Sequence, residues 1–416
     1  MIPLRSRNYR LYFFGQVVSV PGTWLQTVAQ AWLVLQLTAS GMALGLTVAL
    51  QALPVLLLGP WGGAIADAVD KRRLLLGTQA AQGALALILG TLAITGVVQL
   101  WMVWVLAAGL GVARAVDNPT RQAFISELVA GDALPRAISL NSTVAAAARL
   151  VGPAAGGAII AAIGVGPCFL VNGASFLAVL IALTAMDGAA LLRDATPAGR
   201  APGAVRAGVR YVRRRRDLLV PLLMMALVGT LAYEFQVTIP LLAHTTFGLG
   251  ASGFGLLYAA MGAGAVVAGL TVAGRALPRV RTIAVAALLL GTGLGLAAAA
   301  PSPATAAAAL ALAGAASVVY SSTTNATLQL RADPAMRGRV MALYIVAFMG
   351  STPIGGPLVG AIGEGVGPRA ALAAGAAGCV AAAALALALS PAAPRALHAA
   401  RARCGIGTAP APGRAG

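Results

Sequence analysis

Long apolar segments alternate with short polar segments along almost the whole chain. Each apolar segment reaches or exceeds the roughly 20 residues that a helix needs to cross the hydrocarbon core of a bilayer. We predict transmembrane helices at residues 10–36, 42–66, 74–96, 98–118, 137–163, 166–187, 218–243, 251–273, 280–300, 303–323, 339–362 and 368–390. The pattern therefore predicts an all-α polytopic membrane protein with 12 transmembrane helices and very short connections on one side.

Basic residues mark the other side. All of them except Arg149 and Arg369 fall in seven clusters, and two predicted spans separate each cluster from the next. The clusters lie at Arg5–Arg10, Lys71–Arg73, Arg114–Arg136, Arg193–Arg216, Arg275–Arg281, Arg331–Arg339 and from Arg395 onward. Because positively charged loops resist translocation, we predict that both termini and all seven clusters are cytoplasmic, in a bacterial inner membrane.

Composition excludes several classes of protein. Of the 416 residues, 59% are hydrophobic and only 10% are charged, which leaves too little polar surface for a soluble globule. The net charge of +18 follows from the basic loops, so we expect no nucleic-acid partner. Cys168, Cys379 and Cys404 lie far apart and lack neighbouring histidines, so we predict no metal site, disulfide framework or cofactor.

The two halves of the chain match each other in sequence. Three motifs recur in the same order at separations of 207, 204 and 201 residues. They are NPTRQ at 118–122 with NATLQ at 325–329, Gly152-Pro153 with Gly356-Pro357, and GVGP at 164–167 with 365–368. Since each half holds an even number of spans, both enter the membrane in the same orientation, as in transporters built from parallel repeats.

This repeat predicts the domain organisation. We expect a six-helix bundle at 1–187, a cytoplasmic linker at 188–217, a second six-helix bundle at 218–390 and a disordered cytoplasmic tail at 391–416. In the linker, Val205, Val209 and Val212 share one helical face, and arginines occupy the rest. This pattern is typical of a helix at the membrane surface, although a solvated linker that obeys the positive-inside rule fits equally well.

The connection between the second and third spans reads GGAIADAVDKRR. Gly63 and Asp67 have the spacing of the motif found at this place in the major facilitator superfamily, which the segment resembles. Alanine replaces the arginine that often follows the aspartate, so the resemblance assigns the charge relay of the inner gate to Asp70, Arg72 and Arg73. The alternative is ordinary topology-setting charge, which leaves Asp67 unexplained because acidic residues contribute little to topology.

The fifth span contains GPxxGG, formed by Gly152, Pro153, Gly156 and Gly157. It resembles the antiporter motif of drug exporters in that superfamily, and the LNS at 140–142 is similar to the branch with the enterobactin exporter and macrolide efflux proteins. Physically, glycines four residues apart let another backbone approach, and proline permits a bend. Plain helix packing is the alternative to a bend that serves transport.

Polar residues within spans are costly, so each is a candidate for function. Arg149 and Glu234 are the two deep charges, and Thr230 and Thr238 lie four residues either side of Glu234. Burying an ionised carboxylate costs free energy, so proton binding at Glu234 could be coupled to transport. The competing interpretation of Glu234 is that a partner group neutralises its carboxyl group, or that the carboxyl group opens to water outside the membrane. The competing interpretation of Arg149 is a structural hydrogen bond to backbone carbonyls of a neighbouring span.

Other polar residues within the predicted spans are also candidates for the transport pathway. The resemblance implies that the first, fourth, seventh and tenth spans face a central pathway, and we find a polar face on all but the fourth. The remaining candidates for the substrate or proton pathway are Gln16, Thr23, Gln26, Gln30, Asn141, Ser317, Ser321 and Thr324.

We therefore predict a secondary active transporter that exports a small amphipathic compound, such as a drug, siderophore or metabolite, in exchange for protons. An uptake symporter or facilitator is the first alternative, and a non-transporting membrane scaffold is the second. A membrane enzyme is disfavoured because His244 and His398 lie near opposite membrane faces and cannot form one site. The chain has no Walker sequence, so we expect no ATP-driven transport.

Overall fold

The computed structural model describes residues 3–129, 131–192, 204–272, 279–334 and 336–389. Its first half consists of six long helices, with a short 3₁₀ segment before the first of them (Pro3–Arg5) and another between the fourth and the fifth (Gly131–Ala133). The helices are α1 (Arg7–Thr38), α2 (Gly41–Ala68), α3 (Lys71–Ile94), α4 (Leu100–Leu128), α5 (Leu134–Ile163) and α6 (Gly166–Thr184). The tail predicted at 391–416 lies outside the described residues.

The second half also contains long helices, but two of them are interrupted. The elements are α8 (Arg216–Ala232), α9 (Phe235–Leu241), a π-helical turn (Leu242–Thr246), α10 (Ala251–Val272), α11 (Val280–Ala299), α12 (Pro303–Arg331), α13 (Arg337–Met349), α14 (Thr352–Gly365) and α15 (Pro368–Leu389). Helix α7 (Ala204–Arg213) precedes them in the predicted linker.

Eleven segments of the described chain are long and apolar enough to span a membrane. Two of them combine interrupted elements, at Arg216–Thr246 and Arg337–Gly365. Helix α1 is not among the eleven, because its glutamines and hydroxyls lower its hydropathy. At 32 residues it is about 48 Å long, which is sufficient to span the membrane. A multi-pass membrane protein is thus supported, and α1 as the twelfth span stays a prediction.

Two predicted helix ends are wrong. Helix α4 continues ten residues beyond position 118, to Leu128, and α12 continues eight residues beyond 323, to Arg331. The basic cluster at Arg114–Arg136 favours a loop after position 118. In the structure, buried partners on α1 and α3 bind Asp117 and Arg121, so the helix continues through them.

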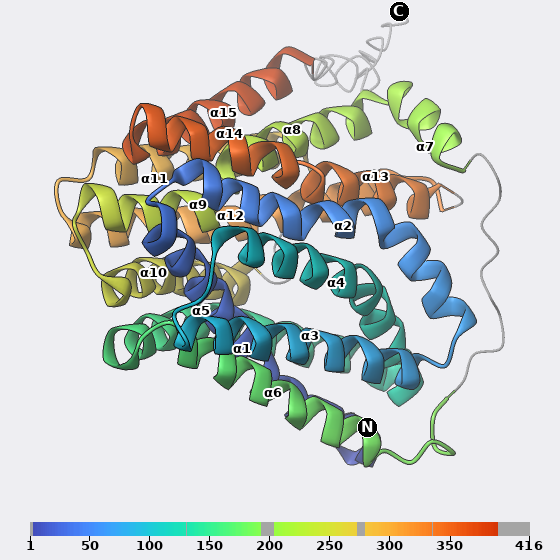
Figure 1. The fold of residues 1–416 in the computed structure, drawn as a ribbon. Coiled ribbons are helices and arrows are strands. Elements are labelled where there is room, and N and C mark those ends of the chain that lie inside the picture. The colour runs from blue at the N-terminus through green and yellow to red at the C-terminus, as the bar shows by residue number, and fades with distance from the viewer. Residues whose placement is uncertain (1–2, 130, 193–203, 273–278, 335, 390–416) are drawn as a thin grey trace, which may run out of the picture.

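The predicted linker contains a helix, α7, but its position at the membrane surface stays a prediction. Val212 is buried, whereas Val209 and the arginines of the helix are exposed. The Tyr211 hydroxyl accepts a hydrogen bond from the Asp333 backbone N–H, just beyond the end of α12. This contact holds α7 against the end of α12 (Figure 1), at an end of the molecule that we call the basic end because α7, the turn that follows it and the start of α8 carry Arg206, Arg210, Arg213, Arg214, Arg215 and Arg216.

The two halves meet at the opposite end, here called the hairpin end. Gly41 and Gly45 of α2 lie against the backbone of Gly360 and Gly356 of α14, so close that a Cβ on Gly45 would collide with the Gly356 carbonyl oxygen. Gly157 of α5 lies in the same way against α10, where a Cβ would fall 2.9 Å from the Gly255 Cα.

The halves separate toward the basic end. The contact between α2 and α13 lies at Leu56 and Gly350, and beyond it α2 bends away from α13 (Figure 1). Helix α2 contains Pro54 and Pro60, which account for a bend. Past Pro60, Trp61 is 64% exposed. The halves are therefore in backbone contact at the hairpin end and diverge toward the basic end.

Candidate functional site

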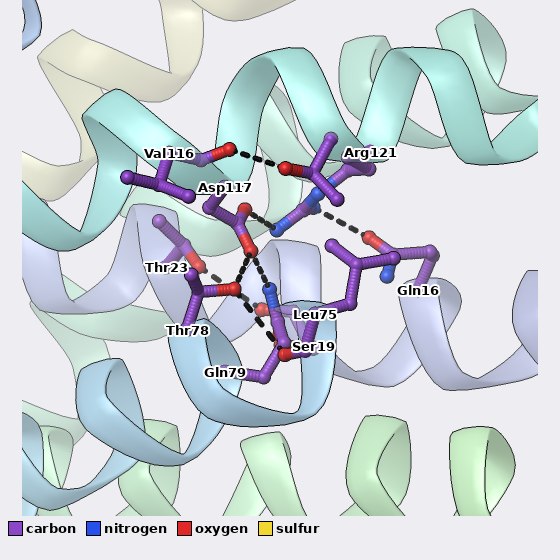
Figure 2. A network of polar contacts seen from close by, with 10 residues as sticks. Gln16, Ser19, Thr23, Leu75, Thr78, Gln79, Val116, Asp117 and Arg121 are labelled. Atoms are coloured by element: carbon purple, nitrogen blue, oxygen red, sulfur yellow. Dashed lines mark hydrogen bonds and ion pairs between the residues drawn. The ribbon is translucent and has the colours of Figure 1, made fainter. Parts of the chain in front are cut away.

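A network of polar side chains centres on Asp117 of α4 (Figure 2). The Asp117 side chain is only 1% exposed, and its Oδ1 accepts hydrogen bonds from Thr78 at 2.8 Å and Gln79 at 2.7 Å, both on α3. Its Oδ2 pairs with Arg121 at 2.6 Å, and Arg121 donates to the Gln16 side-chain oxygen of α1 at 2.7 Å. Three helices of the first half are thus joined through one ion pair.

A second network lies one helical turn away on α4. Arg114 donates to the Gln51 side-chain oxygen of α2 at 3.4 Å, and Gln51 donates to Gln30 of α1 at 2.8 Å. The prediction that the fourth span lacks a polar face is therefore wrong. The signal in the sequence was the i,i+4 spacing of Asp117 and Arg121, which suits an ion pair on a helix.

The polar residues predicted along α1 bind helices of their own half. Gln16 contacts α4, Gln30 contacts α2, and the Gln26 side chain accepts a hydrogen bond from Asn172 of α6. All three glutamines are buried. Thr23 donates to the Ser19 carbonyl oxygen within α1. Most of this polar stripe therefore joins helices within the first half.

Arg149 lies where the two halves meet. Its guanidinium carbon is 5.2 Å from the centroid of the Trp24 ring on α1, and its backbone contacts Gly262 of α10. The Trp24 ring lies 6.3 Å from the Tyr258 ring of α10. Within the described residues Arg149 forms no ion pair, and its buried Nε has no hydrogen-bond partner.

The glycines of the GPxxGG motif determine this placement. A Cβ on Gly152 would fall 2.8 Å from the Pro21 carbonyl oxygen of α1, and Gly156 packs on Leu25. Gly157 faces α10, as described above. Pro153 lies inside α5, which is continuous from Leu134 to Ile163. The motif thus packs α5 between a helix of each half, while its role in bending stays a prediction.

Glu234 occupies an interruption of the seventh predicted span. Helix α8 ends at Ala232 and α9 begins at Phe235, so Thr230 and Thr238 do not share one continuous helix as predicted. Both threonine hydroxyls donate to backbone carbonyl oxygens, at Ala226 and Glu234 respectively.

The Glu234 side chain is buried among the helices of the second half. Its exposed fraction is 2%, and its Oε1 has no hydrogen-bond partner within the described residues. A Cβ added to Gly355 of α14 would lie 2.9 Å from that oxygen. The carboxyl group therefore abuts the helix that contacts α2 at the hairpin end.

The α12 candidates divide into two sets. The Ser317 and Thr324 hydroxyls donate to carbonyl oxygens of their own helix, and the Ser317 carbonyl accepts from the Tyr233 hydroxyl at 2.7 Å. Ser321 also donates within α12, to the Val318 carbonyl oxygen, but it differs from the other two in lining a pocket of about 430 Å³. The other residues around this pocket are Ser322, Asn325, Ala326, Gln329 and Tyr344. Asn325 and Gln329 come from the repeated NATLQ motif.

The predicted gating loop contacts the first half. Asp70 caps α3 by accepting a hydrogen bond from the Arg73 backbone N–H at 3.0 Å, and Arg72 donates to the Leu183 and Thr184 carbonyl oxygens at the end of α6. Asp67 is exposed on the last turn of α2.

The sequence did not indicate two other contacts near this loop. Lys71 pairs with Glu127 of α4 at 2.7 Å. The glycine in closest contact with α4 is Gly62, since a Cβ there would collide with the Ala115 carbonyl oxygen, while its neighbour Gly63 is half-buried.

In α5, Asn141 is half-buried, and its Nδ2 has no hydrogen-bond partner within the described residues.

Comparison of sequences identifies relatives among bacterial transporters. Over 213 residues the chain is 28% identical to the uncharacterized MFS-type transporter YfiS of Bacillus subtilis (strain 168), an alignment that covers 50% of each protein. It is 30% identical over 176 residues to the staphyloferrin A transporter of Staphylococcus aureus (strain NCTC 8325 / PS 47), which covers 42% of this chain and 44% of that protein. The chain therefore matches about half the length of these relatives.

Solved structures share the fold over nearly the whole chain. An inward-facing, occupied bacterial homolog of the human lysosomal transporter Spinster aligns with a TM-score of 0.72 at 16% identity, covering 94% of this chain and 100% of that one. A bacterial homologue of the iron transporter ferroportin, in an inward-facing state, also aligns with a TM-score of 0.72, at 15% identity, covering 93% and 99%. Family and fold are those of membrane transporters.

A match to the family described as transmembrane secretion effector extends over residues 1–402. It includes the GPxxGG motif, the Asp117 network and both halves of the fold. The chain therefore belongs to the transmembrane secretion effector family of the major facilitator superfamily.

Proposed function

We propose that this transporter exports a small amphipathic compound from the bacterial cytoplasm in exchange for protons, by alternating access between bundles at 1–187 and 218–390. In this proposal α1 is the twelfth span, residues 188–217 form the cytoplasmic linker, and the basic end with both termini faces the cytoplasm. The positive-inside rule supports that orientation. The site opening toward the basic end would then receive compounds from the cytoplasm.

One observation carries the proposal. The two halves touch through backbone contacts at Gly45–Gly356 and Gly157–Gly255, and α2 bends away from α13 toward the basic end (Figure 1). Glycine contacts of this kind can part and reform without side-chain rearrangement, because only backbone surfaces meet. Arg149, at the contact between α5 and α10, is a charged group that a compound between the halves would reach.

Proton coupling is assigned to Glu234. Its carboxyl group abuts Gly355, the residue next to Gly356, which contacts α2 across the closed end. A change from neutral to charged at Glu234 would alter the packing of α14 at this point and hence the stability of the closed end. Burial of an ionised carboxylate is costly, so the proton occupancy and the conformation must influence each other.

The test uses inverted membrane vesicles with an acidic interior. Candidate compounds are ethidium, Nile red and carboxyfluorescein, which differ in charge. We expect Glu234→Gln to abolish accumulation driven by the pH gradient while exchange of internal for external compound persists. The control is Asp333→Asn, which changes an exposed carboxylate at the basic end.

Three outcomes oppose the proposal. Gradient-driven accumulation by Glu234→Gln at the wild-type rate would remove this residue from coupling. Gradient-driven loss of compound from inverted vesicles, with accumulation in right-side-out vesicles, would indicate an uptake carrier. No movement of any compound by a correctly inserted protein would favour the scaffold alternative.

A further inference from the structure

The first half of the protein holds more positive than negative charge within its spans. Arg121 is neutralised by Asp117, but Arg114 has the neutral Gln51 as its hydrogen-bond partner, and Arg149 has no carboxylate within ion-pair distance among the described residues. An uncompensated charge inside a membrane protein is costly, and such residues usually face a pathway or a ligand.

The neighbours of Arg149 show that it does not face lipid. The guanidinium lies over Trp24 of α1, and the same turn of α5 presses its backbone against Gly262 of α10. Tyr258, one turn earlier on α10, is 3% exposed and packs near Trp24. Helices from both halves therefore flank the cation, at the contact between α5 and α10.

Further aromatic rings cluster in the second half. The Tyr233 ring lies 5.5 Å from the Phe348 ring. Phe348 in turn stacks on Tyr344, which lines the pocket of about 430 Å³. A flat apolar molecule could thus contact aromatic rings from either half, while an anionic group on it meets Arg149.

We propose that Arg149, Trp24 and Tyr258 form an anion-binding subsite, so that the exported compound carries a carboxylate or another anionic group attached to an aromatic or apolar body. This inference rests on the proposed function, because it assigns a substrate class to the same opening. The guanidinium supplies charge-assisted hydrogen bonds, and the Trp24 ring holds it in place from one face.

The test is a binding measurement with two small probes that differ mainly in charge. Purified full-length protein in nanodiscs is titrated with 1-naphthoate and with 1-naphthamide, and binding to empty nanodiscs is subtracted. We expect wild-type protein to bind the naphthoate about tenfold more tightly, because a charge-assisted hydrogen bond is roughly twice as strong as a neutral one. Arg149→Gln should remove this difference, and Arg149→Lys should retain part of it.

The matched control is Arg369→Gln, which removes the bond that Arg369 makes to the Ala300 carbonyl oxygen, away from the opening. It should leave the preference unchanged. A second measurement needs no variant: bound naphthoate should protect Arg149 from phenylglyoxal, as mapped by mass spectrometry. Equal affinity for the two probes, no measurable binding of either at millimolar concentration, or unchanged modification of Arg149 would overturn the proposal.

Transport measured in parallel separates this inference from the proposed function. Export of neutral or cationic compounds without preference for the anionic probe would reject the subsite and leave export standing. Preference for the naphthoate that Arg149→Gln removes, together with failure to move any compound outward, would support the subsite and reject export.

Discussion

A carboxylate joins the two halves at the closed end, and we expect its removal to favour opening there. The Glu364 side-chain oxygen of α14 accepts hydrogen bonds from the Ser40 hydroxyl at 2.5 Å and the Met42 backbone N–H at 3.0 Å. Both donors lie at the N-terminus of α2, where the helix dipole also favours a negative charge. The perturbation is Glu364→Gln, which keeps the shape of the side chain and removes its charge.

The size of the effect follows from these contacts. A hydrogen bond to a charged group contributes about 1.5–3 kcal/mol, against about 0.5–1.5 kcal/mol for a neutral one. Because Glu364 is exposed, solvent screens both hydrogen bonds. We therefore expect Glu364→Gln to weaken the two bonds together by only about 1 kcal/mol. The ratio of molecules open at the hairpin end to molecules closed there should therefore rise about fivefold.

The assay measures the distance between spin labels on the two halves. Labels at Thr95→Cys and Ala299→Cys, both exposed positions at the hairpin end, report its opening in a Cys404→Ser background. The native Cys168 and Cys379 are buried and need no replacement. We expect Glu364→Gln to increase the population at long distance.

The matched control is Ser302→Ala. This serine caps α12 at the same end, but it binds Thr305 of its own half. A double variant with Ser40→Ala should show less than the sum of the single effects, because both changes remove one contact. An unchanged distance distribution in Glu364→Gln, or additive effects in the double variant, would refute the reasoning.

Two further predictions concern the closed end and the Asp117 network. Gly45→Leu should block closure of the hairpin end and abolish transport without preventing insertion. The control Gly77→Leu should transport normally, because a Cβ at Gly77 meets open space. Equal transport activity of the two variants would contradict the packing argument. Asp117→Ala should lower the free energy of unfolding by about 3–5 kcal/mol, measured as a fall in thermal stability, because it leaves Arg121 unpaired. Adding Arg121→Met should recover part of that loss, and no recovery would show that the ion pair is not the cause.

Hydropathy predicted where the spans lie but not where every helix ends. It placed a boundary at residue 118 because Asp117 and Arg121 resemble loop charges when their partners are unknown. Those partners, Thr78, Gln79 and Gln16, lie about 40 and 100 residues away in the chain. A single sequence does not reveal such pairing, so the most extensive polar network of the first half was missed.

The two helix interruptions differ in how visible they are in the sequence. Between α13 and α14 the sequence reads GSTP, and both glycine and proline favour an interruption. Around Glu234 it reads LAYEFQ, with no such residue, yet α8 and α9 are separate helices. The position of Glu234 beside Gly355 therefore depends on tertiary packing, and the predicted face of Thr230, Glu234 and Thr238 could not anticipate it.

The order of the helices relates the two contacts that close the hairpin end. Helix α2 is the second long helix of its half and contacts α14, the end of the fifth span of the other half; α5 and α10 make the reverse pairing. The closure is therefore symmetric in its backbone, but its charges are not. Arg149 lies at the α5–α10 contact, and Glu234 abuts the α2–α14 contact. If the halves rock as rigid bodies, both contacts must open together. An anion bound at Arg149 and a proton bound at Glu234 would then both shift the equilibrium between the closed and the open hairpin end, without touching each other.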